Sequence, residues 1–172
     1  MEKKYVLQIL FAILITIIVL LYGSRVEDYA AFGYFGVFII SLISSATIII
    51  PAPGWIAVLE LGKYLDPILL GIFAGIGSAI GELTGYFAGS GIVGILGKDK
   101  KIINEHKEII RKYDISAIFF LSFIPNPAFD FAGIAAGAIK MDVKKFLIAC
   151  AIGKSLRFFL IAYLGLYTLN LF

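Results

Sequence analysis

The sequence predicts an all-α integral membrane protein that forms a single membrane domain over residues 1–172. The chain is 60% hydrophobic and only 16% charged, and its mean hydropathy is +0.97, whereas soluble domains carry about 25% charged residues. The apolar residues occur in long runs, each of which is a candidate membrane span. Two of these runs are broken by closely spaced prolines, one in each half. This composition leaves no room for a soluble catalytic domain.

Residues 5–22 are predicted to be an N-terminal transmembrane helix. This run follows Lys3 and Lys4 and is apolar throughout, and about 20 apolar residues are needed to cross the hydrocarbon core. A secretory signal peptide has the same charged start. Because no small-x-small cleavage pattern follows, a retained span is favoured.

The first repeat is predicted over residues 32–96 and contains the first proline break. Apolar sequence stops at Pro51-Ala52-Pro53-Gly54, and a shorter apolar segment follows over 55–65. Proline lacks a backbone donor and clashes with the preceding turn, so this stretch cannot be one continuous helix. Such a break at membrane depth is tolerated where protein or a water-filled cavity shields the backbone. We therefore expect a re-entrant helical hairpin with Pro51 and Pro53 at its tip.

A long span is expected next, over residues 68–96. Four of its glycines recur every four residues and share one face, which lets a neighbouring helix approach closely. The neighbour belongs either to the same chain or to a second copy, so a homodimer is left open. The four are Gly77, Gly81, Gly85 and Gly89.

Residues 98–112 are predicted to form an amphipathic helix at the membrane interface. Six basic and three acidic residues leave a charge of +3 in this segment, and isoleucines repeat along one face of it. His106 is interpreted as one more interfacial polar group, because the chain has no second histidine to share a metal ion.

The second repeat is predicted over residues 115–170 and follows the plan of the first. Pro125-Asn126-Pro127-Ala128 separates apolar runs at 115–124 and 129–139, and a final span covers 146–169. A second re-entrant hairpin is therefore expected before the last span.

The two halves are predicted to form an inverted repeat. From the first proline of each break to the glycine of the next Ile-Gly pair in a span, the distance is 26 residues in one half and 28 in the other. Because a single full span separates the breaks, the hairpins enter from opposite sides of the membrane. Many secondary transporters have this arrangement, with the tips near the midplane. The tips are Pro51, Pro53, Pro125 and Pro127.

Basic residues in the short connections predict the orientation of the chain. If both hairpins re-enter, the basic N-terminus, the 98–112 helix and the lysines of 140–145 lie on one side. The other side then holds only Arg25 and Lys63 as basic residues. We expect the N-terminus in the cytoplasm, in a multi-pass protein of the cell (plasma) membrane.

Five ionisable residues are predicted to lie within the membrane. A charge placed there costs at least about 2.5–3.5 kcal/mol, so such residues usually face a cavity or pair with one another. The basic pair on the last span is one turn apart and would attract phosphate, while the carboxylates would balance its charge or take up protons. The five are Glu60, Glu82, Asp130, Lys154 and Arg157, and Asn126 at the second tip joins them as a headgroup-binding residue.

Alternatives stay open for these residues. They could form buried ion pairs, such as Glu82 with Arg157, that only fix how the helices pack. Replacing a buried ion pair by apolar groups is often neutral or stabilising, so stability alone is a poor reason to keep these charges. A functional cavity is therefore favoured. Glu60, on the return arm of the first hairpin, is equally compatible with a place at the membrane surface.

Motifs in the second half resemble those of a known family. Residues 123–137 contain Pro125-Asn126-Pro127 and Phe129-Asp130, and Gly153-Lys154 follows in the last span. Together with Gly81-Glu82, they resemble the VTT domain of the DedA / SNARE-associated Golgi protein superfamily and are most similar to its vacuole membrane protein branch. The likeness covers residues 33–165.

The resemblance implies that the protein moves lipids. Eukaryotic relatives of that branch are phospholipid scramblases, and bacterial DedA relatives are implicated in recycling undecaprenyl phosphate with dependence on proton-motive force. Bacterial members usually place an arginine shortly before the second proline motif, where this chain has Ser122. That departure argues against a coupled phospho-carrier mechanism.

We therefore interpret the chain as an energy-independent phospholipid scramblase whose partners are membrane lipids. The alternative is a proton-coupled transporter, or flippase, of a polyprenyl phosphate or a small anionic solute, and a third reading is a non-transporting membrane scaffold. No enzyme is expected, since the sequence has no nucleophile elbow and no metal-ligand cluster. No cofactor or nucleic acid is expected either, because the one basic stretch carries an apolar stripe suited to lipid headgroups.

Overall fold

The computed structural model describes residues 6, 10, 32–46, 54–96, 115–124 and 129–169. The predicted N-terminal span, apart from Val6 and Leu10, and the predicted interfacial helix at 98–112 lie outside the described residues. Both proline breaks lie outside them as well. The arms of the two predicted hairpins and the two long spans are described.

Every regular element among the described residues is a helix, as the sequence predicts. Residues 115–123 form one helical segment. The other helices are α3 (Gly33–Ala46), α4 (Gly54–Leu61), α5 (Pro67–Gly81), α6 (Leu83–Leu96), α8 (Phe129–Ala138) and α9 (Val143–Leu169).

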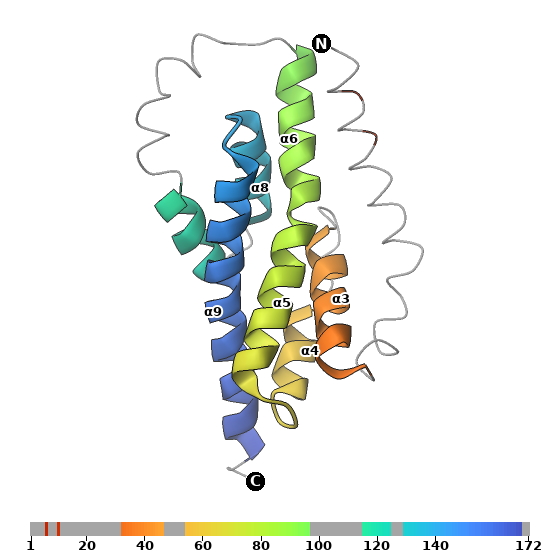
Figure 1. Ribbon diagram of the computed structural model, residues 1–172, viewed down its shortest axis with the longest axis vertical. Coiled ribbons are helices and arrows are strands. Elements are labelled where there is room, and N and C mark those ends of the chain that lie inside the picture. Colours follow the sequence, from red (N-terminus) through yellow and green to blue (C-terminus); the bar gives the residue numbers. More distant parts are fainter. Residues whose placement is uncertain are drawn as a thin grey trace.

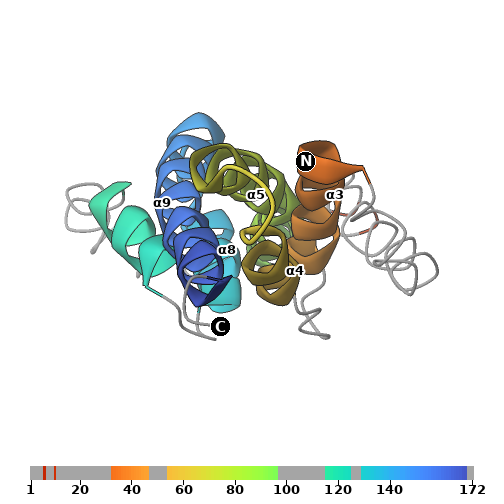
Figure 2. The ribbon, with the colours of Figure 1, turned by 90° about the horizontal axis from the view of Figure 1, so that it is seen from below.

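The centre of the molecule is a column of α5 and α6 with α9 beside it (Figure 1). Helices α3 and α4 lie beside α5, whereas α8 lies beside α6. Figure 2, which looks along the helices, shows α5 and α9 side by side, with α3 and α4 next to α5 and residues 115–123 next to α9. The arms of the two predicted hairpins therefore flank the two long spans.

Helices α3 and α4 form an antiparallel pair. A Cβ on Gly54, at the start of α4, would lie 3.0 Å from the Ser44 side chain near the end of α3. Val58 of α4 shares an apolar cluster with Val37, further back along α3.

The predicted long span is one helical column with an irregularity at Glu82, between α5 and α6. The backbone ladder continues through it, because Glu82 N–H donates to Ser78 O at 3.1 Å and Tyr86 N–H donates to Glu82 O at 3.0 Å. The Thr84 hydroxyl lies 2.9 Å from Gly81 O. Such side-chain bonds to a preceding carbonyl compete with regular helix geometry.

Two aspartates set where the long helices begin. Asp66 precedes α5, and its Oδ1 accepts hydrogen bonds from two N–H groups of the first turn, both at 3.0 Å. Asp142 precedes α9, and its Oδ1 accepts from Lys145 N–H at 3.0 Å. Both act as N-caps. As a result α9 begins at Val143, three residues before the predicted start of the last span.

The end of α8 has the Schellman geometry. Met141 N–H donates to Ala136 O and Lys140 N–H donates to Gly137 O, both at 3.0 Å. Lys140 has a φ of 56°, the left-handed conformation that this motif requires after a helix and that glycine usually supplies. The turn from α8 to α9 is therefore short and defined.

Glycines let the column contact the hairpin arms at backbone distance. A Cβ on Gly77 would lie 2.2 Å from Phe38 O of α3, and one on Gly89 would lie 2.0 Å from Ile134 O of α8. A Cβ on Gly81 would likewise meet the backbone of α3. The predicted close approach is confirmed for these three glycines, and the neighbouring helices belong to the same chain.

Two apolar clusters lie on either side of Lys154 along α9. The first uses Phe158 and Ala162 of α9, and the second uses Phe146 and Cys150. Lys154 falls between them, one turn from each. The remaining members of the first cluster are Val37, Val58, Leu70 and Ala74, and those of the second are Ala79, Tyr86, Ile118, Ala132, Ala136, Met141 and Ala149.

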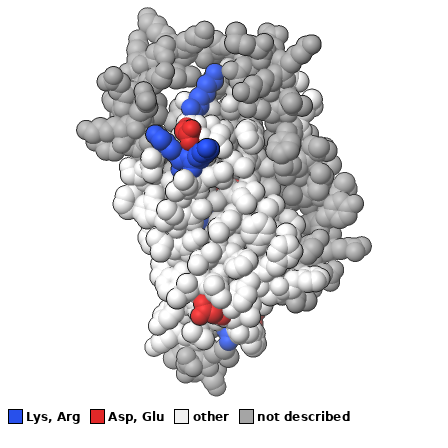
Figure 3. Space-filling model, in the orientation of Figure 1, with Lys and Arg blue, Asp and Glu red and all other residues white. Residues whose placement is uncertain are grey.

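The outer surfaces of the long helices are apolar. Four isoleucines of α5 recur every four residues and are 40–58% exposed. Figure 3 shows most of the charged side chains of one face toward its two ends, with an almost entirely uncharged band between them. Pro67–Val93 and Val143–Tyr167 are long and apolar enough to cross a membrane. The described residues thus have the features of an all-α membrane protein. The four isoleucines are Ile68, Ile72, Ile76 and Ile80.

Candidate functional site

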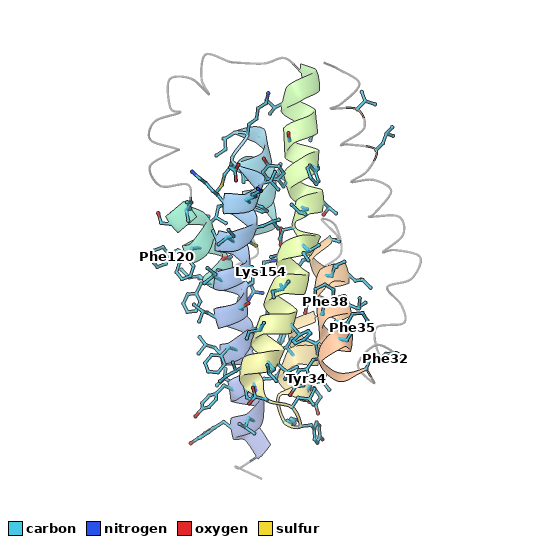
Figure 4. All side chains as sticks on the ribbon, in the orientation of Figure 1. Phe32, Tyr34, Phe35, Phe38, Phe120 and Lys154 are labelled. Atoms are coloured by element: carbon cyan, nitrogen blue, oxygen red, sulfur yellow. The ribbon has the colours of Figure 1, made fainter. Side chains whose placement is uncertain are left out.

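The site is centred on a buried ion pair between α9 and the α5–α6 junction. Lys154 Nζ lies 2.5 Å from Glu82 Oε1. Lys154 is 4% exposed and Glu82 is 3% exposed, and each lies near the middle of its span. Figure 4 places Lys154 between α9 and α5. Two opposite charges are therefore held together away from solvent, which requires hydrogen-bond partners for both.

Two serine hydroxyls complete the surroundings of the ammonium. Lys154 Nζ donates to Ser78 Oγ at 2.7 Å and to Ser45 Oγ at 3.3 Å, and the two hydroxyls are hydrogen-bonded to each other. Ser78 precedes Glu82 by one turn on α5, and Ser45 lies in the last turn of α3. An ammonium has three donors, and three oxygens from these elements surround it.

Thr84 joins α3 to the central column close to the ion pair. Its buried hydroxyl on α6 lies 2.9 Å from the carbonyl oxygen of Ala46, the residue that follows Ser45. This contact holds α3 against the α5–α6 junction, so Ser45 lies next to Lys154.

Helix α8 covers Glu82 from another side. A Cβ on Gly133 would lie 3.2 Å from Glu82 Oε2, so the second carboxylate oxygen faces the backbone of α8. Tyr86, one turn after Glu82, donates its hydroxyl hydrogen to Met141 O just beyond α8. The ion pair is thus enclosed by α3, an arm of the first predicted hairpin, and by α8, an arm of the second.

Arg157 lies one turn from Lys154 on α9 and is half-buried. Its guanidinium carbon is 5.4 Å from the centroid of the Phe158 ring, within the range of a cation–π contact. The structure describes an ion pair of Glu82 with Lys154, where the sequence suggested Arg157 as an example. The two basic residues predicted to act together therefore have different surroundings.

Glu60 lies apart from the buried pair. Its side chain is 58% exposed and its Oε2 is 2.9 Å from Lys63 Nζ, in an ion pair on the surface. Glu60 is six residues after Gly54 in α4, which places it about 9 Å along the helix axis from the first break. This geometry favours the surface position that the sequence left open.

The remaining predicted site residues are only partly covered by the structure. Asp130 lies in the first turn of α8, but its side chain lies outside the described part of the chain. The other residues predicted at the tips lie outside it entirely. They are Pro51, Pro53, Pro125, Asn126 and Pro127.

Sequence reasoning did not single out Ser45, Ser78 or Thr84 as site residues. Ser78 could have been found, because it precedes Glu82 by four residues and so shares its helix face. Ser45 and Thr84 carry no comparable signal, since their roles depend on how α3 packs against the column. Within the described ranges, no group of three or more His, Cys, Asp or Glu side chains could hold a metal ion.

Fold and site together define a class, a helical membrane protein with an ion pair buried between its spans at mid-depth. Residues 50–167 match the VTT domain. The match covers more than half of the chain, so the protein belongs to the VTT-domain family, that of the DedA and SNARE-associated Golgi proteins. This family is regarded as transporter-like. No curated protein and no solved structure matched the chain.

Proposed function

We propose that the protein is a scramblase that moves phospholipids between the two leaflets without an energy source. The observation that carries the proposal is the buried Lys154–Glu82 pair near the middle of both spans. Charged groups at this depth mark substrate pathways in membrane proteins. A phospholipid headgroup contains a phosphate, which the Lys154 ammonium attracts as a point charge. Arg157, one turn away, adds a planar fork of donors that suits phosphate oxygens.

The lipid tails would remain on the outside of the helices during exchange. An apolar groove of about 260 Å³ lies between α5 and α9. Ser155 in its wall directly follows Lys154, so the groove reaches the level of the ion pair on the outer side of α9. An acyl chain in this groove would lie beside the polar layer while staying in contact with the bilayer. The groove is lined by Ile68, Ile72, Ser155, Leu156 and Phe159.

Reconstitution into vesicles tests the scramblase. Vesicles of phosphatidylcholine and phosphatidylglycerol would carry a headgroup-labelled fluorescent lipid, and a membrane-impermeant quencher would report which leaflet holds the label. We expect the purified protein to expose inner-leaflet label to the quencher. The double variant Glu82→Gln/Lys154→Met should lose this exchange, whereas Lys63→Met, the same lysine change at an exposed pair, should retain it. Unchanged exchange in the double variant would favour a membrane scaffold instead.

A proton-coupled transporter of a polyprenyl phosphate or a small anionic solute is the second candidate. The 2.5 Å distance between Lys154 Nζ and Glu82 Oε1 favours it, because transfer of one proton across that contact removes both charges. Carboxylates in such positions serve as proton relays in pumps and transporters. If lipid exchange stops when a protonophore abolishes the pH gradient, the protein is this proton-coupled transporter and not a scramblase.

We also propose that the chain is an inverted repeat of a re-entrant hairpin and a span. The first arm of each hairpin supports this, since it meets the following span at a glycine. In the first half a Cβ on Gly77 would meet Phe38 O of α3, and in the second a Cβ on Gly153 would lie 2.6 Å from Phe119 O. Both glycines follow an isoleucine and come from the Ile-Gly pairs noted in the sequence.

The second arms give further support, because each meets the span of the other half. A Cβ on Gly89 would meet Ile134 O of α8, and one on Gly165 would lie 2.0 Å from Leu59 O of α4. Gly89 follows Gly77 by twelve residues, and Gly165 follows Gly153 by the same number. Equal spacing of equivalent contacts is what an internal repeat predicts.

For the orientation we propose a plasma-membrane protein with its N-terminus in the cytoplasm. Exposed lysines at the α8–α9 turn mark one end of the described structure, and they share a predicted side with the N-terminus and the 98–112 segment. A cysteine introduced at Lys144 should react with impermeant thiol reagents only after the cytoplasmic face is opened. The lysines are Lys140, Lys144 and Lys145.

Within the family, we propose that the chain belongs to the vacuole membrane protein branch. The proposal rests on the motifs Pro125-Asn126-Pro127 and Phe129-Asp130.

A further inference from the structure

We propose that Ser45, Ser78 and Glu82 form a binding site for a monovalent alkali cation, which the Lys154 ammonium occupies in this structure. The three oxygens converge on one point, with distances to Lys154 Nζ of 3.3 Å, 2.7 Å and 2.5 Å respectively. A single cation is thus surrounded by two hydroxyls and one carboxylate. The lysine supplies that cation from α9, a helix that contributes none of the three oxygens.

The three oxygens are held together by contacts that do not involve the lysine. Ser45 and Ser78 are hydrogen-bonded to each other. Thr84 Oγ1 lies 2.9 Å from Ala46 O and so ties α3 to the α5–α6 column. The glycines of the column also hold α3 at backbone distance. We therefore expect the arrangement of oxygens to persist when the lysine side chain is replaced.

The electrostatics of the site match a cation of charge one. Glu82 is 3% exposed, so its negative charge needs a partner close by. One carboxylate and two neutral hydroxyls balance one positive charge.

Lys154 is in this view a tethered competitor for the alkali cation. While its ammonium occupies the site, sodium or potassium is excluded by charge and by space. The site becomes available when the ammonium withdraws or when the residue is replaced. This inference concerns cation binding and stands apart from the scramblase, because it needs neither lipid nor leaflet exchange.

The test is the thermal stability of Lys154→Met in detergent, in choline chloride and in sodium or potassium chloride at equal ionic strength. A ligand at a hundredfold excess over its Kd raises the Tm of a chain of this size by about 5–10 °C. We expect a saturable rise of that order in sodium or potassium chloride for Lys154→Met. The wild type should not respond, since the ammonium fills the site. The double variant Glu82→Gln/Lys154→Met, which has no carboxylate, should not respond either.

Equal Tm values for Lys154→Met in all three salts would overturn the proposal, because Glu82 would then only take up a proton. A rise that also appears in the double variant would overturn it too, as a general salt effect. Lys154→Gln serves as a second variant, since its amide keeps a donor for Ser78. Potassium in the cell should fill the site while Lys154→Met and Lys154→Gln fold, so both variants should be recoverable. If neither can be purified while Glu82→Gln/Lys154→Met can, the cation site is contradicted as well.

Discussion

Lys154 and Glu82 are separated by 72 residues in the sequence, yet Lys154 Nζ lies 2.5 Å from Glu82 Oε1. The pair connects the two long spans near their midpoints, at the level where α8 passes Glu82. Removing one member of such a pair is costly, because the other charge remains buried, whereas replacing both is often tolerated. The pair therefore ties the packing of the two spans to the charge state of the site.

A double-mutant cycle measures this coupling. Glu82→Gln removes the carboxylate of this buried pair, and Lys154→Met removes its ammonium, so each should lower the free energy of unfolding by about 3–5 kcal/mol. The double variant should lie within about 1 kcal/mol of the wild type or above it. Denaturant unfolding in detergent with choline as the only cation gives the three values and their interaction energy.

Lys63→Met is the matched control for the cycle. Lys63 Nζ pairs with Glu60 Oε2 at 2.9 Å on the surface, and exposed pairs contribute about 0–1 kcal/mol. An equal loss for Lys63→Met and Lys154→Met would show that burial of the Glu82–Lys154 pair has no energetic consequence.

Two buried serines should respond to alanine with opposite signs. Ser78 Oγ accepts a hydrogen bond from the Lys154 ammonium, so Ser78→Ala should lower the free energy of unfolding by about 1.5–3 kcal/mol. Ser41 is 1% exposed, and its hydroxyl has no hydrogen-bond partner among the residues that the structure describes. Ser41→Ala should be neutral or stabilising, because it removes a polar group whose burial is uncompensated. A larger loss for Ser41→Ala than for Ser78→Ala would contradict this account of the polar layer.

The sequence predicted most of the helices because their causes are local. Apolar runs, glycine spacing and proline breaks are properties of short segments, and they located α3 to α6, α8 and α9 to within a few residues. The helix of the last span begins at Val143, three residues before the span predicted from 146, because Asp142 acts as its N-cap. The irregularity at Glu82 was missed, since it involves contacts of the Thr84 hydroxyl with Gly81 O and with Ala46 O of α3.

The composition of the site was less predictable, because it depends on how helices pack. Lys154 and Arg157 are three residues apart on one helix, and the rotation and axial position of α9 against α5 bring Lys154 Nζ to 2.5 Å from Glu82 Oε1. Ser45 becomes part of the site only because α3 packs on α5. Glu60 shows the converse case, in which a carboxylate in apolar sequence lies at the surface beside Lys63.

The turn after α8 offers a stabilising substitution. Lys140 has a φ of 56°, a conformation that costs a non-glycine residue about 1–2 kcal/mol. Lys140→Gly should therefore be more stable than Lys140→Ala by about 1 kcal/mol, since both variants lose the lysine side chain and only one keeps a Cβ. Thermal unfolding of the two variants in detergent provides the comparison. If Lys140→Ala is the more stable, the left-handed turn is not what limits stability there.

Adding a methyl group at the equivalent glycines of the two halves tests the proposed repeat. A Cβ on Gly137 would lie 1.8 Å from Tyr86 O, and one on Gly62 would lie 2.3 Å from Ala162 O. Both obstacles are backbone atoms, so the helices must separate, at a typical cost of about 1–3 kcal/mol or more. We expect Gly137→Ala and Gly62→Ala to be destabilised to a similar extent and to pack their hairpins less closely. The free energy of unfolding in detergent measures the first effect, and protease sensitivity of the loosened helices measures the second.

Ala135→Leu is the control for Gly137→Ala, because Ala135 lies on the exposed face of the same helix. Its larger side chain should enter the surrounding detergent or lipid and change the free energy of unfolding by no more than about 0.5 kcal/mol. A loss confined to Gly137→Ala, with Gly62→Ala as stable as the wild type, would mean that the two hairpins do not pack equivalently. The inverted repeat would then lose its main support, because equal spacing of glycines would no longer correspond to equal contacts.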